Sequence, residues 1–493
     1  MSAIKTNVLD NKVLENSFFT HLFTKNGASC LLHSLTLNKV YGGNLLRELN
    51  SLFSQPRQVT EVIDQLSVNY SKDLLVLAIT DLWKQGLLIS DGEIDLKDYI
   101  WRYNQGVNQY SIQNMYFLPT NACNLRCKYC FIEDSNRPFT PSYMTQDIAE
   151  KGLRVFAKLT ENADNINMTF YGGEPLLNAD VVYHSMRYVR ELQHEGAFKR
   201  PVNMSLLTNG VLADDKTIEA VLETKTIVSV SIDGPGVLNR ARKDIKGNDT
   251  FDKALAGYRR FQDAGIGVGI SCTLSRFNVE HITEITEFIV NDLKPTGMGF
   301  NILLPTINGG NPVDIDPEFT TNQLIEAFKI LREAGIYEDR MMRRCKPYMD
   351  GGFHLKDCMG VGGQIALTPD GMIGPCQVLL GVNEFFPLDV NVLYSKLDSI
   401  SSEDIYKDAL FNEWRYRFPL NMKKCADCFA IAICGGGCPY AAYANHGSIW
   451  EIDDRVCYQS KQILEWMLWD TYDRMVENQD AGTVTDVPQV QLE

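Results

Sequence analysis

The sequence contains no run of about 18 consecutive apolar residues, the length that predicts a transmembrane helix. Residues 1–30 also lack the basic start and the long apolar stretch of a secretory signal peptide. Both absences argue against membrane insertion and export. We therefore expect a soluble chain with a cytoplasmic location and no membrane partner.

Basic residues are in the minority. Lys and Arg number 47 against 62 Asp and Glu, which gives a formal net charge of −15, and no run of Lys and Arg offsets it. Such a charge repels a phosphate backbone, so we expect no nucleic acid partner.

The composition gives no sign of disorder or of a fibrous repeat. Apolar residues make up 45% of the chain and charged residues 22%, which are the values of ordinary folded proteins. At about 150 residues per domain, 493 residues predict two to four domains and a large core.

Cysteine, by contrast, is abundant, with 13 residues. Thiols stay reduced in a chain that is not exported, so grouped cysteines predict a metal site rather than disulfides. Three lie within residues 123–130 and seven within residues 358–457. Cys30 and Cys272 fall in predicted strands, and we expect both to be buried apolar residues.

Residues 1–105 are predicted to form a small winged-helix-like domain. Apolar alternation over residues 30–41 and a Gly-Gly turn indicate a short hairpin, and three amphipathic segments follow at 45–53, 59–70 and 73–90. These segments carry more acidic than basic residues. That charge favours binding of a peptide along a sheet edge over binding of nucleic acid.

Residues 106–310 alternate between short apolar strands and amphipathic helices, which predicts an α/β fold with parallel strands. Five helices are expected to start near Thr145, Ala179, Asp214, Thr250 and Asn278. Six predicted strands cover residues 115–119, 166–172, 202–208, 227–233, 267–274 and 297–305. Six such units favour a partial (β/α)6 TIM-like barrel, whose ligand site lies at the carboxyl ends of its strands.

The remainder of the chain is expected to hold a bridging region and a Cys-rich domain. We place the bridging region at 311–344, the Cys-rich iron–sulfur domain at 345–470 and a flexible tail at 471–493. The Cys-rich part has many Gly residues and little periodicity before its last helix.

The first cysteine group directly follows the first predicted strand of the barrel. Cys123, Cys127 and Cys130 have the spacing C-x3-C-x2-C. Structural zinc takes four protein ligands, whereas a four-iron cluster on three thiolates keeps one iron open to another ligand. A zinc loop with a distant fourth ligand remains the alternative.

This loop and its position resemble those of the radical S-adenosylmethionine enzymes. The resemblance implies a 4Fe-4S cluster on the three thiolates, with S-adenosylmethionine on the open iron. It also implies cleavage of that cofactor to a 5′-deoxyadenosyl radical, which abstracts hydrogen from C–H bonds.

Polar motifs at the ends of later strands agree with this resemblance. Gly172, Gly173 and Glu174 are similar to the family motif that meets the cofactor's amino group. The chain departs from the common family pattern over residues 239–242, where Arg242 is the expected partner of the cofactor's carboxylate. Four further residues are expected to contact its ribose or carboxylate, although turn chemistry also explains some of them: Thr208, Asn209, Ser231 and Asp233.

The second cysteine group resembles the SPASM domain of radical enzymes that modify peptides, and the whole resemblance covers about residues 110–465. It implies two auxiliary 4Fe-4S clusters, and therefore three clusters in the chain. A pair of zinc sites is the alternative. The first auxiliary cluster is expected on Cys358, Cys376 and Cys438, with Cys345 as the candidate fourth ligand or else an iron open to substrate. The second is expected on Cys425, Cys428, Cys434 and Cys457.

The N-terminal domain is similar in pattern to PqqD-like domains, which hold the leader of a ribosomally made precursor peptide. The resemblance therefore implies a peptide maturase of RiPP biosynthesis, an oxidoreductase that installs a C–C or thioether crosslink. Its partners would be a precursor peptide and a reductant such as flavodoxin or ferredoxin.

Three alternatives stay open. An anaerobic sulfatase-maturating enzyme would form formylglycine, but enzymes of that type commonly carry Asp where this chain has Gln377 after Cys376. A peptide epimerase would need a hydrogen donor, for which Cys272 or Cys345 is available. A non-catalytic iron–sulfur scaffold for peptide delivery is the third. The residues do not single out a general base.

Overall fold

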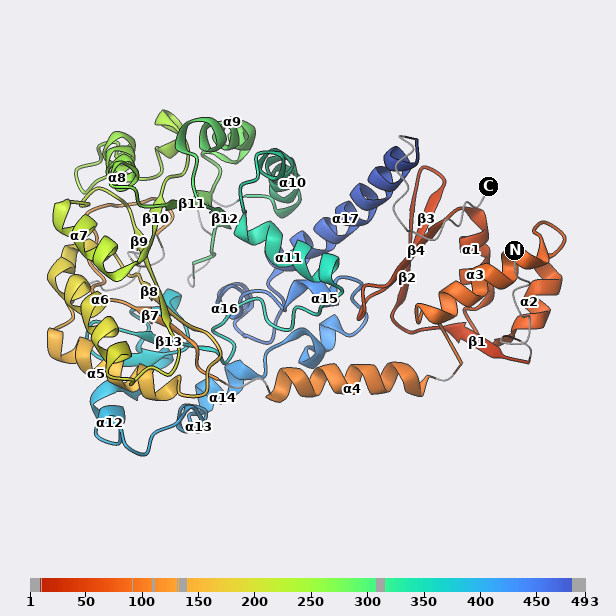
Figure 1. The fold of residues 1–493 in the computed structure, drawn as a ribbon, viewed down its shortest axis with the longest axis horizontal. Helices are drawn as coiled ribbons and strands as arrows, with labels where there is room; N and C mark the ends of the chain where they lie inside the picture. The colour runs from red at the N-terminus through yellow and green to blue at the C-terminus, as the bar shows by residue number, and fades with distance from the viewer. Residues whose placement is uncertain are drawn as a thin grey trace.

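The computed structural model describes residues 9, 11–90, 92–108, 111–130, 132, 140–306 and 315–480. The N-terminal domain lies at one end of the molecule and the barrel at the other, with the Cys-rich region between them (Figure 1). No helix in these ranges is long and apolar enough to cross a membrane.

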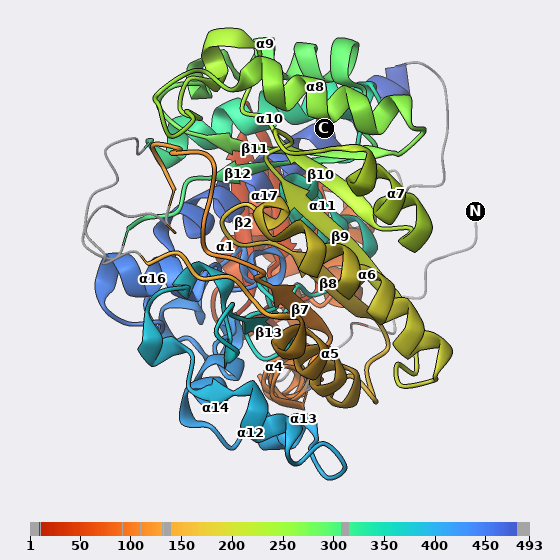
Figure 2. The same ribbon diagram turned by 90° about the vertical axis from the view of Figure 1, so that its left-hand side faces the viewer.

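All six predicted barrel strands are present and parallel, in chain order across the sheet. Each ends where a Gly, Pro or polar residue interrupts the apolar run. Figure 2 shows the strands with helices on their outer side. The strands are β7 (Asn114–Phe117), β8 (Ile166–Phe170), β9 (Val202–Thr208), β10 (Ile227–Ser231), β11 (Val268–Leu274) and β12 (Met298–Ile302).

The predicted helix starts also agree with the structure. Thr145 and Asp214 cap their helices by accepting hydrogen bonds from backbone N–H groups of the first turn. The barrel helices are α5 (Gln146–Leu159), α6 (Ala179–His194), α7 (Asp215–Thr224), α8 (Phe251–Asp263) and α9 (Ile282–Phe288), and α10 (Pro317–Glu333) and α11 (Asp339–Asp350) follow β12.

The barrel sheet continues into the Cys-rich region, which the sequence did not predict. Strand β13 (Gln364–Leu367) pairs in parallel with β7. Strands β14 (Met372–Gly374) and β15 (Leu388–Asp389) add antiparallel pairs and complete a nine-stranded sheet. The two regions therefore share one hydrogen-bonded sheet.

Short helices make up most of the rest of the Cys-rich region. They are α12 (Val390–Tyr394), α13 (Ser402–Ile405), α14 (Ala409–Arg415), α15 (Ile431–Cys434) and α16 (Pro439–His446). The long helix α17 (Asp454–Asp480) runs past residue 471, where we had placed the start of a flexible tail. Its apolar residues pack against α10 and α11, which keeps the chain helical, and residues 481–493 lie outside the described ranges.

The N-terminal domain contains the predicted hairpin and three helices. The hairpin strands are β3 (Ala28–His33) and β4 (Lys39–Gly42), and the helices are α1 (Asn44–Leu52), α2 (Val59–Leu66) and α3 (Lys72–Lys84). The sequence missed β1 (Val13–Asn16), β2 (Thr20–Lys25), β5 (Arg57–Gln58) and β6 (Leu88–Ile89), which build sheets of order β2-β3-β4 and β5-β1-β6. The winged-helix likeness stays a prediction.

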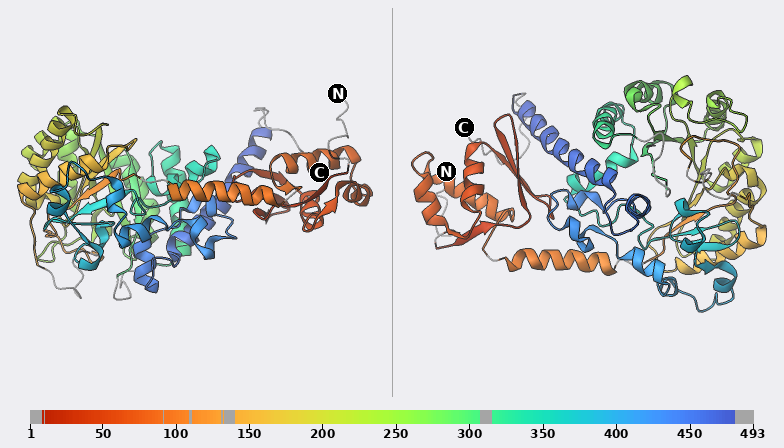
Figure 3. Two further views of the ribbon diagram at one scale, coloured as in Figure 1. Left: turned by 90° about the horizontal axis from the view of Figure 1, so that it is seen from below. Right: turned by 180° about the vertical axis from the view of Figure 1, so that it is seen from behind.

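The N-terminal domain contacts the rest of the chain on two sides (Figure 3). On one side, the Tyr41 hydroxyl of β4 donates to the Leu468 carbonyl of α17 at 2.8 Å. On the other side, α4 (Glu93–Asn108) spans from the domain to the Cys-rich region, where the Tyr99 hydroxyl donates to the Leu420 carbonyl. These two attachments hold the domain against the Cys-rich region.

We expect Gly257→Ala to destabilise the barrel, although Ala favours a helix more than Gly does. A Cβ at this position of α8 would collide with the Gly210 carbonyl oxygen in the loop after β9. Overpacking of this kind costs about 1–3 kcal/mol, which a lower thermal midpoint in circular dichroism would report. Gly92→Ala is the control, since its Cβ would meet nothing within 4 Å. Equal midpoints for the two variants would contradict this packing.

Candidate functional site

A cavity of about 440 Å³ lies at the carboxyl ends of the barrel strands. One wall comes from the loops after β7 to β12, and the opposite wall comes from α11, α17 and the Cys-rich region. The site predicted from the strand pattern and this cavity therefore coincide.

The first cysteine group lines the barrel side of the cavity. Cys123, Cys127 and Cys130 all reach it. Their loop is fixed by backbone hydrogen bonds from Arg126 N–H to the Lys243 carbonyl at 2.6 Å and from Lys128 N–H to the Ala241 carbonyl at 2.9 Å. These bonds hold the loop open toward the cavity without any disulfide.

Burial keeps the Cys123 thiol protonated in the absence of a positive ligand. Burial and the Glu174 carboxylate raise the pKa of Cys123 to about 12. A cationic metal centre would supply the charge that a thiolate needs here.

Gly172 and Gly173 bring the loop after β8 against the cysteine loop. A Cβ on Gly172 would collide with the Thr120 carbonyl oxygen, and one on Gly173 with the Ala122 carbonyl oxygen. Gly172 also has φ of +128°, a conformation that favours glycine. Both residues line the cavity, as predicted.

Glu174 lies in the cavity wall with its carboxylate fixed in place. It is 1% exposed and accepts hydrogen bonds from the Thr208 hydroxyl at 2.7 Å, from Asn209 N–H at 2.8 Å and from Leu176 N–H at 3.2 Å. Burial raises the pKa of Glu174, and these bonds oppose the rise. Thr208 and Asn209 line the cavity too, and the structure gives them the additional role of positioning this carboxylate.

Ser231 lines the cavity, whereas Asp233 is not among its lining residues, and the predicted cofactor contacts of both stay predictions. The Asp233 side chain turns away because it accepts hydrogen bonds from the Tyr129 hydroxyl at 2.5 Å and from Thr273 N–H at 3.0 Å. Burial raises the pKa of Asp233, and the positive charge of the nearby Arg242 opposes this rise.

Arg242 lines the cavity, and Tyr129 and Asp233 hold its side chain in place. Its guanidinium donates to the Tyr129 hydroxyl at 2.6 Å and lies 3.8 Å from Asp233. Arg242 is 7% exposed, so its charge faces the cavity interior rather than bulk water. Tyr129 lies between Asp233 and Arg242, a role that the sequence did not predict.

The second cysteine group is divided between two cavities. Cys358, Cys376 and Cys438 line the large cavity, opposite the first group. A separate, smaller cavity is lined by the other four: Cys425, Cys428, Cys434 and Cys457. Across the described ranges, no three or more His, Cys, Asp or Glu side chains are grouped so that they could hold a single metal ion.

Cys345 lines neither cavity. It lies on α11, 5% exposed, and the charges that act on it include Arg332 of α10 and Asp470 of α17. Its predicted role as a ligand stays a prediction. Cys30 and Cys272 are fully buried within strands, as expected.

Four arginines on the far wall were missed, because nothing in their spacing marks them. They are Arg340, Arg343, Arg344 and Arg455. Arg343 and Arg344 each pair with a carboxylate, Asp339 at 2.8 Å and Asp357 at 2.7 Å. Ion pairs therefore hold part of this wall in place.

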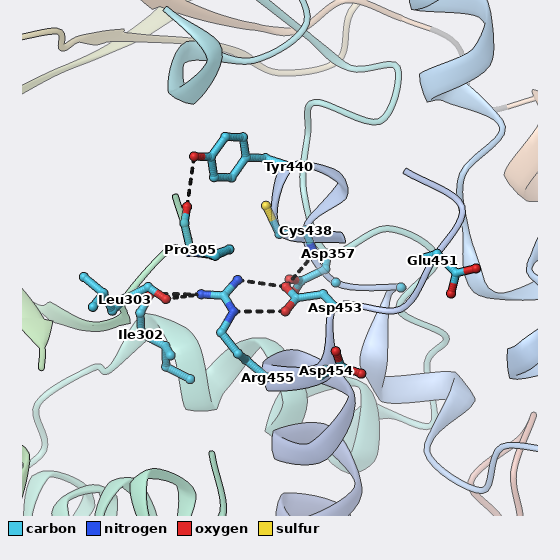
Figure 4. Close-up of polar contacts among 12 residues, drawn as sticks. Ile302, Leu303, Pro305, Asp357, Cys438, Tyr440, Glu451, Asp453, Asp454 and Arg455 are labelled. Atoms are coloured by element: carbon cyan, nitrogen blue, oxygen red, sulfur yellow. Dashed lines mark hydrogen bonds and ion pairs between the residues drawn. The ribbon is translucent and has the colours of Figure 1, made fainter. Parts of the chain in front are cut away.

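Arg455 joins the two walls (Figure 4). Its guanidinium donates to both carboxylate oxygens of Asp453, at 3.1 and 3.0 Å, and also to the Leu303 carbonyl just after β12. Asp453 in turn accepts a hydrogen bond from Cys438 N–H at 3.1 Å. This chain of contacts fixes the Cys438 loop against the barrel.

Comparison with known proteins gives a family match for the barrel. Residues 117–289 match the model described as the radical SAM superfamily. The radical SAM cyclopropyl synthase TigE of Paramaledivibacter caminithermalis is 22% identical over 469 residues, 89% of this chain and 92% of that protein. A cysteine-type anaerobic sulfatase-maturating enzyme of Clostridium perfringens is 24% identical over 364 residues, 70% of this chain and 94% of that protein.

A solved structure shares the fold over most of the chain. SuiB of Streptococcus suis bound to S-adenosylmethionine has a TM-score of 0.54 at 15% identity, over 90% of this chain and 99% of that chain. SuiB bound to its precursor peptide SuiA has a TM-score of 0.52. Residues 117–289 are thus similar in sequence to the radical SAM superfamily, and the chain is an enzyme.

Proposed function

We propose that this enzyme is a peptide maturase that installs an oxidative C–C or thioether crosslink in a ribosomally made precursor peptide. The observation that carries the proposal is the single cavity lined by both Cys123, Cys127 and Cys130 and, opposite them, Cys358, Cys376 and Cys438. An oxidative crosslink removes two hydrogens and two electrons, which suits a site with two redox groups facing one substrate.

The residues of the barrel wall fit a 4Fe-4S cluster and S-adenosylmethionine. Three thiols converge on the cavity, beside a buried carboxylate at Glu174 and a buried guanidinium at Arg242. An amino acid moiety carries one ammonium and one carboxylate, which these two groups match in charge. When bound, the cluster and cofactor supply hydrogen-atom abstraction from a C–H bond.

The chain's own residues bind and orient around that chemistry. Thr208 and Asn209 fix the direction of Glu174, and Tyr129 and Asp233 fix that of Arg242. Since both charged groups are buried, water competes little for them. A substrate side chain enters between this wall and the arginines of α11.

The N-terminal domain supports a peptide as substrate. In the sheet β2-β3-β4, the outer strands β2 and β4 are the edges to which an extended leader can add as a further strand. His21 and Phe23 of β2 contact the ring of Phe429, next to Cys428, with ring centroids 6.2 and 5.2 Å apart. A leader held on this sheet would thus place the following peptide beside the Cys-rich region.

Formylglycine formation is the second candidate, favoured by the sulfatase-maturating relative. Gln377 lines the cavity where that class commonly has Asp, and its side-chain oxygen accepts a hydrogen bond from Gln364 at 3.1 Å. An amide does not take up a proton at neutral pH, so Gln377 does not serve as a general base. We therefore rank this candidate second.

The proposed function is tested by the mass of a precursor peptide co-expressed with the enzyme in ordinary and in heavy water. We expect a loss of two hydrogens per modification that is absent with the Cys127→Ala variant. A gain of one deuterium without that loss would show epimerisation instead. A product that reacts with a hydrazide probe would show formylglycine, and an unmodified peptide would favour the sulfatase-type activity or a different precursor.

The cluster assignment predicts about 12 iron atoms per chain after anaerobic reconstitution, four for each cluster. Replacing Cys123, Cys127 and Cys130 by Ala should remove about one third of the iron, and so should replacing the four cysteines of the smaller cavity. Cys272→Ala is the matched control and should keep all of it. Unchanged iron in Cys345→Ala would take Cys345 out of the ligand set, and bound zinc in place of iron would contradict the assignment.

Arg242→Gln should weaken equilibrium binding of S-adenosylmethionine by about tenfold or more, because a charge-assisted hydrogen bond contributes about 1.5–3 kcal/mol. Binding is measured by calorimetry on reconstituted protein whose iron content matches the wild type. Arg242→Lys should recover part of the affinity. The control Lys253→Gln, on the exposed face of α8, should bind normally. Wild-type affinity in Arg242→Gln would exclude Arg242 as a cofactor contact.

A further inference from the structure

Three cationic side chains surround one aromatic ring at the outer rim of the barrel. Lys128 Nζ lies 4.9 Å from the centroid of the Phe277 ring, and the guanidinium carbons of Arg240 and Arg276 lie at 5.3 and 5.2 Å. They come from the loops that follow three different strands, β7, β10 and β11. We call Lys128, Arg240, Arg276 and Phe277 the rim patch.

The charge of the rim patch is available to a partner. All three cationic residues are exposed. In the described part of the chain, the ion pairs of the neighbouring loop involve other lysines, Lys243 with Asp249 and Lys253 with Asp244, and no carboxylate lies within ion-pair distance of the three. Three positive charges that lie close together without a counter-ion repel one another. The cation–π contacts with the Phe277 ring offset only part of this repulsion.

The rim patch stands out against the charge of the whole chain. The net charge is −15, so an acidic protein is repelled by most of the surface and attracted at this place. A patch of this kind steers association and sets orientation. Charge complementarity therefore indicates an acidic partner.

The position of the patch indicates what the partner does. Lys128 lies between Cys127 and Cys130, whereas none of the four patch residues lines the cavity. A partner on the patch would thus contact the cysteine loop from outside the cavity. Across that loop it can exchange electrons with the site, but it cannot exchange atoms with the substrate.

We propose that the rim patch is the docking surface for an acidic one-electron carrier protein. This inference rests on the proposed function, in which the site on Cys123, Cys127 and Cys130 must gain an electron for each turnover. In each encounter the carrier is oxidised by one electron and that iron–sulfur site is reduced by one electron. No bond forms or breaks in this step, and no proton needs to move.

The test is the double charge reversal Arg240→Glu/Arg276→Glu in the reconstituted full-length protein, with a flavodoxin as the probe. The matched control is Lys199→Glu/Lys216→Glu, which changes the net charge equally at two exposed residues beside α6 and on α7. Lys128 is left unchanged because it lies within the cysteine loop. Binding of oxidised flavodoxin is measured by interferometry at low salt, and electron transfer is measured as bleaching of the iron–sulfur absorbance.

We expect flavodoxin binding to weaken by about tenfold in Arg240→Glu/Arg276→Glu and its electron transfer to slow by a similar factor. Reduction by dithionite, which needs no docking, should stay at the wild-type rate. The wild-type rate with flavodoxin should also fall more steeply with ionic strength than the rate of the variant.

Wild-type binding and electron transfer in the variant would overturn the proposal, and so would an equal loss in the control. A variant that loses affinity for a polyglutamate peptide but accepts electrons normally would assign the patch to an acidic peptide instead. Failure of the proposed function is distinguishable, because it would appear in the mass of the precursor peptide, whereas this test reads only flavodoxin binding and the iron–sulfur absorbance.

Discussion

The Asp453 carboxylate and the Arg455 guanidinium form a bidentate ion pair at the start of α17, with the Asp453 side chain fully buried. A buried pair is stable only if its remaining hydrogen-bonding groups are also satisfied. Here Arg455 donates to carbonyls at the end of β12, and Asp453 accepts from the backbone of Cys438. The two walls of the cavity therefore meet at this pair, and the geometry of the whole site depends on it.

A second buried cation organises the Cys-rich side in a different way. Arg417 is 0% exposed and donates only to backbone carbonyls, those of Ile449, Gly436, Gly437 and Glu451. Two of these carbonyls, those of Gly436 and Gly437, lie between Cys434 and Cys438, which line different cavities. Arg417 thus fixes the two cysteine groups relative to each other, and burial lowers its pKa without a carboxylate partner.

The sequence predicted the features that depend on local pattern. The six barrel strands were recognisable because each is a short apolar run ended by Gly, Pro or a polar residue, and the helix start at Asp214 because Asp caps α7. The division of ten cysteines into three groups was implied by the family resemblances, because spacing alone separates only the first three from the other seven. Contacts between distant segments were not predictable: β13 pairs with β7 across about half of the chain, and Tyr129 meets Asp233 and Arg242 only in the folded state. For the same reason, the sequence pattern could not show that Ser231 lines the cavity while Asp233 accepts a hydrogen bond from Tyr129.

The continuous sheet has a mechanical consequence for the two facing cysteine groups. Cys123 follows β7 and Cys376 follows β14, and β13 is the only strand between them in the described sheet. Neighbouring strands lie about 4.8 Å apart, a spacing fixed by their hydrogen bonds. Because β7, β13 and β14 are hydrogen-bonded in one sheet, the two cysteine groups cannot separate in the way that two hinged domains would. Electron tunnelling between redox centres held by these thiols would therefore occur over a constant distance, whatever peptide is bound.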